Sequence, residues 1–242
     1  MAGHSAWKNI KHRKASVDAK RGKAWSKCSR AVIVAARQGG GDPKFNSSLR
    51  IAIDAAKAAN MPRDTIEKAV KKGAGGADGE SYEPVRYEGY AAGGVAVIAE
   101  CLVANVNKAA ADVRVIFDKN HGNLGVPGSV TYSFHHRGLV LIAAGATSEE
   151  RLFEVALEAG ADDIQGGEEG WQVTCSPVDL ARLRDALEAA AIAIEQAEIT
   201  YLPASIVEID AETAARVAKL VAALEEHDDV QKVHINAEIH DD

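Results

Sequence analysis

The 242-residue sequence has no long apolar run. A helix that crosses a bilayer takes about 20 consecutive apolar residues. The most apolar stretches, 94–101 and 139–144, have the length of strands and lie between polar segments. The sequence therefore argues against an integral membrane protein, and no membrane partner is expected.

Cysteine is scarce: Cys28, Cys101 and Cys175 are far apart, and each lies in an apolar periodic segment. With no CxxC or Cys/His cluster, a zinc ribbon or a redox dithiol has no support. We expect buried thiols in a reducing cytosol. The basic start has no apolar core for a secretory signal, and Gly3 and Gly22 would interrupt the amphipathic face of a mitochondrial presequence. A cytoplasmic location is predicted.

Catalytic signatures are missing as well. The sequence has no HExxH, no GxSxG and no Walker-type phosphate loop. His135 and His136 are neighbours, so on a strand they would face opposite sides. His234 lies in an acidic tail, where alternation over 230–239 predicts that it faces solvent. The glycine-rich segment 121–129 follows a helical pattern, which favours a shaped turn with positive φ at a glycine. No enzyme, no cofactor and no metal is expected.

What the sequence does have is a strong asymmetry of charge. The whole chain carries a net −7, which alone would suggest a protein that repels nucleic acid. Residues 1–73, however, hold 17 Lys and Arg against 5 Asp and Glu, a net of +12. The remainder holds 11 against 30, a net of −19. This division predicts a basic nucleic-acid-binding part joined to an acidic body.

The basic part has the pattern of three helices. Trp25, Cys28, Val32 and Ala35 form the apolar stripe of a first helix that ends at the triplet 39–41. A second helix is expected from an N-cap at Ser47 or Ser48 to Asn60. Pro62 is expected at the start of a third helix, and Gly73 at its end. A linker follows over 73–79.

Beyond the linker the pattern alternates between strands and helices. Strands are expected at 94–102, 128–134, 138–144, 171–176, 194–202 and 230–239, and helices at 108–120, 148–161, 177–190 and 211–227. Repeated β-α-β units with alternating strands indicate an α+β protein built of ferredoxin-like split β-α-β units. The amount of chain suits two such domains after the helical one. The acidic pairs 162–163 and 168–169 are interpreted as solvated loops.

The basic residues differ in how many acidic residues lie near them in the sequence and could neutralise their charge. In the third helix, Asp64 and Glu67 each precede a lysine by four residues, so ordinary surface pairs explain these charges equally well. The arm at 1–23 has Asp18 as its only acid, which favours contact with nucleic acid. Few aromatic residues interleave these charges, namely Trp7, Trp25 and Phe45, and Trp25 is needed by the core. This favours backbone contact with a duplex or with structured RNA.

Long stretches of the chain resemble the YebC/PmpR family. They are GHSAWKNIKHRKASVDAKRGK, VAARQGGGDP, AKAANMPRDTIEKAVKKG, YEGYAAGGVAVIAECL, GNLGVPGSVTYSF and LEEHDDVQKVHINAEI. The resemblance covers essentially the whole chain. It implies a helical domain at 1–79, an α/β domain made of 80–134 and 204–242, and an acidic α/β domain at 135–203 inserted into the second domain.

The resemblance also implies a DNA-binding transcriptional regulator without a catalytic centre, or alternatively a translation factor that binds ribosomal or transfer RNA at the ribosome. Both functions need the basic arm, and duplex DNA is the favoured ligand. A protein partner is further expected on the acidic body. The predicted nucleic-acid contacts are Lys8, Lys11, His12, Arg13, Lys14, Lys20, Arg21, Lys23, Lys27, Arg30, Lys68, Lys71 and Lys72.

Overall fold

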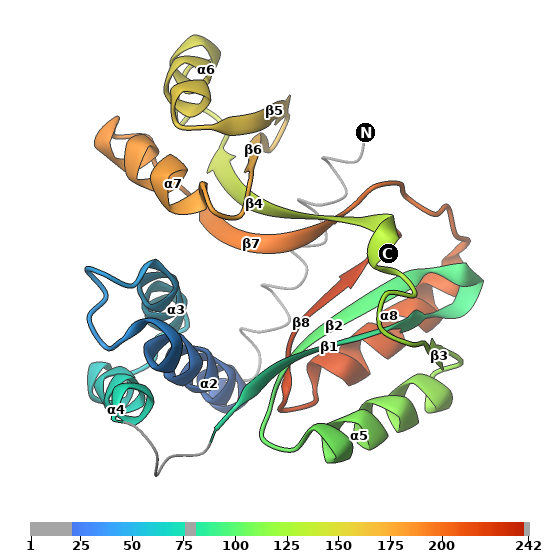
Figure 1. Cartoon of the computed structure of the whole chain (residues 1–242). Coiled ribbons are helices and arrows are strands. Elements are labelled where there is room, and N and C mark those ends of the chain that lie inside the picture. Colours follow the sequence, from blue (N-terminus) through green and yellow to red (C-terminus); the bar gives the residue numbers. More distant parts are fainter. Residues whose placement is uncertain (1–20, 76–80, 240–242) are drawn as a thin grey trace. The chain divides into compact units, whose positions relative to one another are not determined.

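The computed structural model describes residues 21–75 and 81–239 (Figure 1). It is an α+β protein with a helical N-terminal part, two four-stranded antiparallel sheets and helices packed on each sheet. The predicted fold class is thereby confirmed. No helix in these ranges is long and apolar enough to cross a membrane.

The helical part consists of α2 (Arg21–Gly39), α3 (Ser47–Ala58) and α4 (Arg63–Ala74). Their core is built from Val32, Ile33, Leu49, Ile66 and Ala69, which recur at helical spacing. The expected end of the first helix at the glycine triplet is confirmed.

The ends of α3 and α4 differ from expectation. Asn46, rather than a serine, caps α3: its Oδ1 accepts from the amide of Leu49 at 3.0 Å. Pro62 precedes α4, as expected, but Gly73 lies inside the helix and does not end it. A Cβ at Gly73 would lie 2.4 Å from the carbonyl oxygen of Ile33. The glycine is therefore required by the close crossing of α4 and α2.

The first sheet has the order β3-β1-β2-β8, and every neighbouring pair is antiparallel. Its strands are β1 (Glu83–Tyr90), β2 (Ala96–Val103), β3 (Asn123–Leu124) and β8 (Val230–Ile235). Helices α5 (Val106–Lys119) and α8 (Ala211–Glu225) share one face, where Val113, Phe117 and Leu220 pack against Val97 and Ala99. The path from β2 through α5 to β3 leaves β1 between two parallel strands, which is a split β-α-β unit.

Two strand predictions in this region are wrong. Strand β1 was not expected, because Pro84, Glu88 and Gly89 weaken the apolar alternation. Residues 128–134 were expected to form a strand, but they form turns and a short 3₁₀ helix, η2 (Thr131–Ser133), before the next strand begins at Phe134. A second short 3₁₀ helix, η1 (Ala92–Gly94), joins β1 to β2.

The prediction that His234 faces solvent is also wrong. Its imidazole is buried, and Nε2 contacts the Glu100 carboxylate on β2. His234 pairs with Ile98 across the β2–β8 ladder, and Ile98 is fully buried. The face of this sheet opposite the helices is therefore covered at this point, which strand alternation alone does not reveal.

The second sheet has the order β5-β6-β4-β7 and is again antiparallel throughout. It contains β4 (Phe134–Ala143), β5 (Ala161–Gly167), β6 (Gly170–Cys175) and β7 (Gln196–Pro203), with α6 (Glu149–Glu158) and α7 (Leu180–Ala189). The chain order β-α-β-β-α-β with this strand order is the ferredoxin-like arrangement. The acidic pair 162–163 lies on strand β5, not in a loop, although both side chains are exposed.

Among the described residues, the chain forms two compact units. One is 133–206, which contains the second sheet, and the other comprises the helical part and the first sheet. The first sheet takes strands from both sides of the 133–206 segment, which is therefore an insertion. The boundaries 1–79, 80–134 with 204–242, and 135–203 remain our proposal for the three domains.

Candidate nucleic-acid interface

The predicted contact residues fall into three groups along the chain. Those of the arm lie outside the described residues: Lys8, Lys11, His12, Arg13, Lys14 and Lys20. A second group lies on α2, where Arg21 is in the first turn and Lys23, Lys27 and Arg30 follow. The third group consists of Lys68, Lys71 and Lys72 on α4.

The lysines of α2 contact the C-terminal end of α8. Lys23 Nζ donates to the carbonyl oxygen of Glu226 at 2.9 Å, and Lys27 Nζ to that of Glu225 at 2.6 Å. Carbonyl groups at a helix C-terminus have no partner within the helix and carry partial negative charge. Burial lowers the pKa of Lys27, although Glu225 and Asp228 act in the opposite direction. These contacts attach α2 to the first α/β domain.

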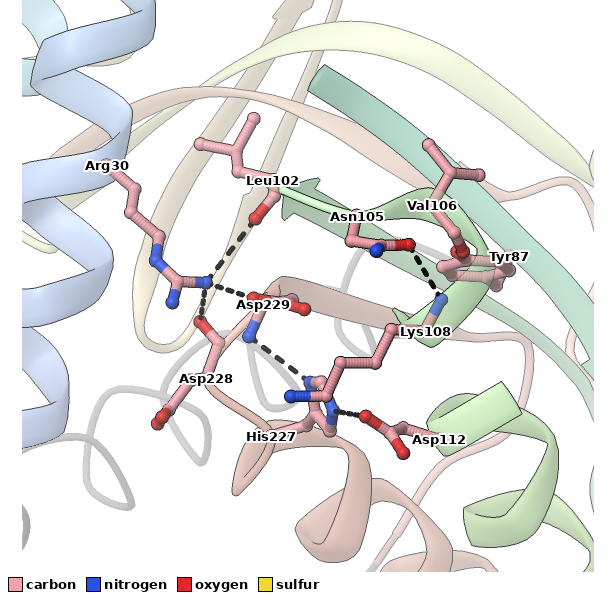
Figure 2. Close-up of polar contacts among 10 residues, drawn as sticks. All are labelled: Arg30, Tyr87, Leu102, Asn105, Val106, Lys108, Asp112, His227, Asp228 and Asp229. Atoms are coloured by element: carbon pink, nitrogen blue, oxygen red, sulfur yellow. Dashed lines mark hydrogen bonds and ion pairs between the residues drawn. The ribbon is translucent and has the colours of Figure 1, made fainter. Parts of the chain in front are cut away.

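Arg30 makes the most extensive contact of this group (Figure 2). Its guanidinium donates to the carbonyl oxygens of Asp228 (2.9 Å) and Leu102 (3.4 Å), and it forms an ion pair with the carboxylate of Asp229. The same group lies over the ring of Tyr82, 5.0 Å from its centre. A phosphate at Lys27 or Arg30 would have to replace these contacts.

The loop that binds Arg30 is held in place by contacts of His227. His227 Nδ1 accepts from the amide of Asp229 at 3.2 Å, and Nε2 lies 3.6 Å from the carboxylate of Asp112 on α5 (Figure 2). This arrangement joins residues nearly 200 positions apart in the sequence, because Arg30 and Asp229 differ by 199. The sequence analysis identified Arg30 as a candidate contact, but nothing in its local pattern pairs it with Asp229.

The lysines of α4 are presented differently. Lys68, Lys71 and Lys72 are exposed, while Ile66, Ala69 and Gly73 form the buried face of the helix. Glu67 was expected to pair with Lys71, but its carboxylate accepts from Arg63 Nε at 2.8 Å, on the preceding turn. The exposed side of α4 is therefore predominantly basic.

The described helical part as a whole is strongly basic. Residues 21–75 contain twelve Lys and Arg against four Asp and Glu, a net charge of +8. The inserted unit, 133–206, contains four against thirteen, a net of −9. The helical part and the insert thus carry net charges of opposite sign, and the positive part is the one that suits a polyanion.

A buried carboxylate, missed by the sequence analysis, shapes the glycine-rich turn. The Glu88 side chain is fully buried on β1, and Oε2 accepts from the amides of Val130 and Thr131, both at 3.0 Å. Burial acts to raise the pKa of Glu88, but the hydrogen bonds from residues 128–131 outweigh it and lower the pKa to about 2. The expected turn is confirmed, with a positive φ at Gly128. Its function here is structural.

The described residues contain no cluster suited to catalysis by a metal. No group of three His, Cys, Asp or Glu within 21–75 and 81–239 could hold a metal ion. Cys101 and Cys175 are buried as expected, and burial raises the pKa of their thiols to about 12 and about 11. Thiols with such pKa values carry little thiolate near neutral pH. Cys28 is only half-buried.

Comparison with known proteins finds family models and relatives that match nearly the whole chain. Residues 5–76 match the model of the TACO1/YebC protein N-terminal domain, and residues 82–237 match that of the TACO1/YebC second and third domain. A probable transcriptional regulatory protein of Persephonella marina is 51% identical over 241 residues, covering 99% of this chain and 96% of the relative. One of Paraburkholderia phytofirmans is 49% identical over 243 residues, covering all of both chains.

A solved structure agrees with these sequence matches. The crystal structure of a conserved hypothetical protein from Aquifex aeolicus superposes with a TM-score of 0.82 at 49% identity, covering 93% of each chain. Fold and sequence therefore point to the same relatives along nearly the full length. The chain belongs to the TACO1/YebC family, whose members similar to it are named probable transcriptional regulatory proteins.

Proposed function

We propose that this chain is a non-enzymatic, cytoplasmic transcriptional regulator that binds duplex DNA through its basic N-terminal arm and helices. The observation that carries the proposal is the net charge of +8 on residues 21–75, which lies on a folded part separate from the acidic insert. The names of the relatives support a regulatory role. No cofactor is required.

In this proposal the binding free energy comes mainly from phosphate contacts. The exposed side of α4 carries Lys68, Lys71 and Lys72, and α4 contains neither Asn nor Gln to pair with adenine. Lysine contacts to phosphates position a protein on the duplex but read no sequence. Lys27 and Arg30 are engaged with Glu225 and Asp229, so a phosphate would compete with these contacts, whereas Lys68, Lys71 and Lys72 extend the basic surface on the exposed side of α4.

The acidic insert has a different role in the proposal. Its net charge of −9 disfavours contact with nucleic acid, so it keeps the molecule oriented with the helical part toward the duplex. The same surface is suited to a basic protein partner of the transcription machinery. Deleting the insert would separate these effects from binding by the helical part.

A salt titration of the full-length chain tests the phosphate contacts. Each contact contributes about −0.9 to the slope of log K against log salt concentration. Neutralising Lys11, Arg13, Lys14 and Lys20 to Gln should flatten that slope by roughly three to four units. The matched control neutralises four exposed cations of the α/β domain, Lys108, Arg114, Lys119 and Lys219. An unchanged slope in the arm variant would refute the arm as the contact surface.

A translation factor that binds structured RNA is the second candidate. The lack of base-reading side chains on α4 favours it, because shape and backbone contacts dominate recognition of structured RNA. Co-sedimentation with ribosomes, set beside competition between duplex DNA and ribosomal RNA, distinguishes the two. Retained DNA affinity without ribosome association at physiological salt would eliminate the translation role.

A further inference from the structure

Phe45 is the most exposed large apolar side chain among the described residues, at 88%. It lies in the loop between α2 and α3. The other aromatic side chain of this part, Trp25, packs against the helical core and donates from Nε1 to the carbonyl oxygen of Ala59 at 3.0 Å. The phenyl ring of Phe45 therefore makes no contribution to the core that would explain its presence.

The loop that carries Phe45 is held by a set of local contacts. Asn46 is buried, and its Nδ2 donates to the carbonyl oxygens of Ala35 and Gly40, both at 2.8 Å. Asp42 accepts from the amide of Lys44 through its side chain (2.9 Å) and from the amide of Phe45 through its carbonyl (3.2 Å). An aromatic ring presented by a preorganised loop loses little conformational freedom when a ligand packs on it.

The loop also lies against the basic end of α4. A Cβ at Gly41 would be 2.9 Å from Ala74 Cβ and 3.5 Å from Val70 Cγ1, so the loop packs on the last turn of that helix. Exposed Lys71 and Lys72 belong to the same turn. Lys44, next to Phe45, is exposed too. The carboxylate of Asp42, the acid of this loop, is engaged within the turn. The loop and the adjoining end of α4 thus carry exposed cations.

We propose that Phe45 stacks on an unpaired base of the bound nucleic acid, while Lys44 and the lysines at the end of α4 contact its phosphates. The inference rests on the nucleic-acid binding proposed above, but it adds to the phosphate contacts with a duplex a contact with a base that lies outside the duplex. Stacking of bases on aromatic rings accepts any base, because every base has a π face. It requires a base outside a regular duplex, in a loop, a bulge or a single strand.

The isolation of the ring argues for a base rather than an apolar protein partner. Exposed residues in the loop and at the adjoining helix ends are small or polar: Gly39, Gly40, Asp42, Lys44, Ser47 and Ser48. A protein partner that binds through apolar area needs a contiguous patch, whereas a base needs one ring flanked by cations.

Fluorescence anisotropy with the full-length chain tests the inference. The probes are RNA and DNA hairpins with an unpaired loop and blunt duplexes of the same stem, length and total charge. Phe45→Ala and Phe45→Leu remove the ring, the latter with little loss of apolar volume, and Phe45→Trp keeps an aromatic surface. Val178→Ala, at another highly exposed apolar site in the insert, is the control.

We expect the Ala and Leu variants to bind the looped probes roughly 5- to 100-fold more weakly and the duplexes within about twofold of the wild type. Phe45→Trp should restore binding, and the salt slope should stay unchanged because no phosphate contact is lost. Equal affinity of all Phe45 variants for the looped probes, with salt-dependent binding intact, would overturn the stacking role alone. Failure of the wild type to bind any probe at low salt would overturn the proposed function as well.

Discussion

The guanidinium of Arg30 and the carboxylate of Asp229 form an ion pair that joins α2 to the loop before β8. Both side chains are largely buried, 16% and 22% exposed. With the lysine contacts to the end of α8, this pair gives three basic residues of α2 a role within the molecule. A basic residue in a positively charged segment is therefore not by itself evidence of a ligand contact.

Removing the guanidinium should destabilise the chain. Arg30→Met keeps most of the apolar side chain but leaves Asp229 largely buried without its partner, so we expect a loss of about 1–3 kcal/mol in the free energy of unfolding. Urea unfolding followed by circular dichroism measures the loss. Arg63→Met, in the exposed pair with Glu67, is the control and should leave stability nearly unchanged. Equal effects of the two variants would contradict a structural role for Arg30.

Glu88 should make stability depend on pH in the acid range. Its pKa falls from an ordinary value of 4.5 to about 2 in the folded state. The ionised form is thus favoured by folding, so the stabilisation is complete above pH 4.5 and is lost as the pH falls toward 2. The shift corresponds to about 3 kcal/mol.

The amide analogue separates this effect from general acid denaturation. Glu88→Gln should lower the free energy of unfolding at pH 7, and the difference from the wild type should shrink at pH 3, because the carboxylate is then protonated in the unfolded chain and folding must release that proton. Unfolding by urea at the two pH values gives the comparison. A difference that is the same at both pH values would show that the charge of Glu88 is not what holds the turn.

Gly73 should not tolerate a side chain. A Cβ there would lie 2.4 Å from the carbonyl oxygen of Ile33, so Gly73→Ala must push α4 away from α2. We expect it to destabilise the chain by about 1–3 kcal/mol, although alanine is the better helix former by about 1 kcal/mol. Gly22→Ala is the matched control, because nothing lies within 4 Å of a Cβ at that position of α2. Thermal unfolding should therefore show shifts of opposite sign for the two variants.

Asn46 should matter more than an ordinary helix cap. Asn46→Ala removes the cap of α3 and the hydrogen bonds to Ala35 of α2 and to Gly40 of the preceding loop, with an expected cost of about 2–3 kcal/mol. Asn105 caps α5 through one bond, to the amide of Lys108, and Asn105→Ala should cost about 1 kcal/mol. Hydrogen exchange of the amides at 40–46 should rise in the first variant alone. Unchanged exchange would show that the loop does not depend on this side chain.

The helical part was predictable because its signals are local. The glycine triplet and Pro62 each act on adjacent residues, and the apolar stripe of α2 identifies its buried side. The errors at the helix boundaries have steric causes in the folded state: Asn46 reaches back to Ala35, and Gly73 faces a carbonyl of another helix. Neither contact can be recognised from the spacing of apolar residues in the sequence.

The sheets and the candidate site were harder to predict from the sequence than the helical part. Strand β1 carries a buried acid whose partners lie more than 40 residues further on, so its pattern resembles a loop. The partners of Lys27 and Arg30 lie almost 200 residues away, so their contacts could not be anticipated from composition. The arm, with six of the predicted contacts, lies outside the described residues, and its role remains a proposal.

The placement of β8 has a consequence for the order in which the chain folds. Helices α2–α4 and the inserted sheet are each formed by one continuous segment of the sequence. Both can therefore fold as the chain emerges during synthesis. Strand β8 follows the insert in the sequence, yet it pairs with β2, and the residues just before it bind Arg30. The first α/β domain is therefore completed only after the part that interrupts it has been synthesised.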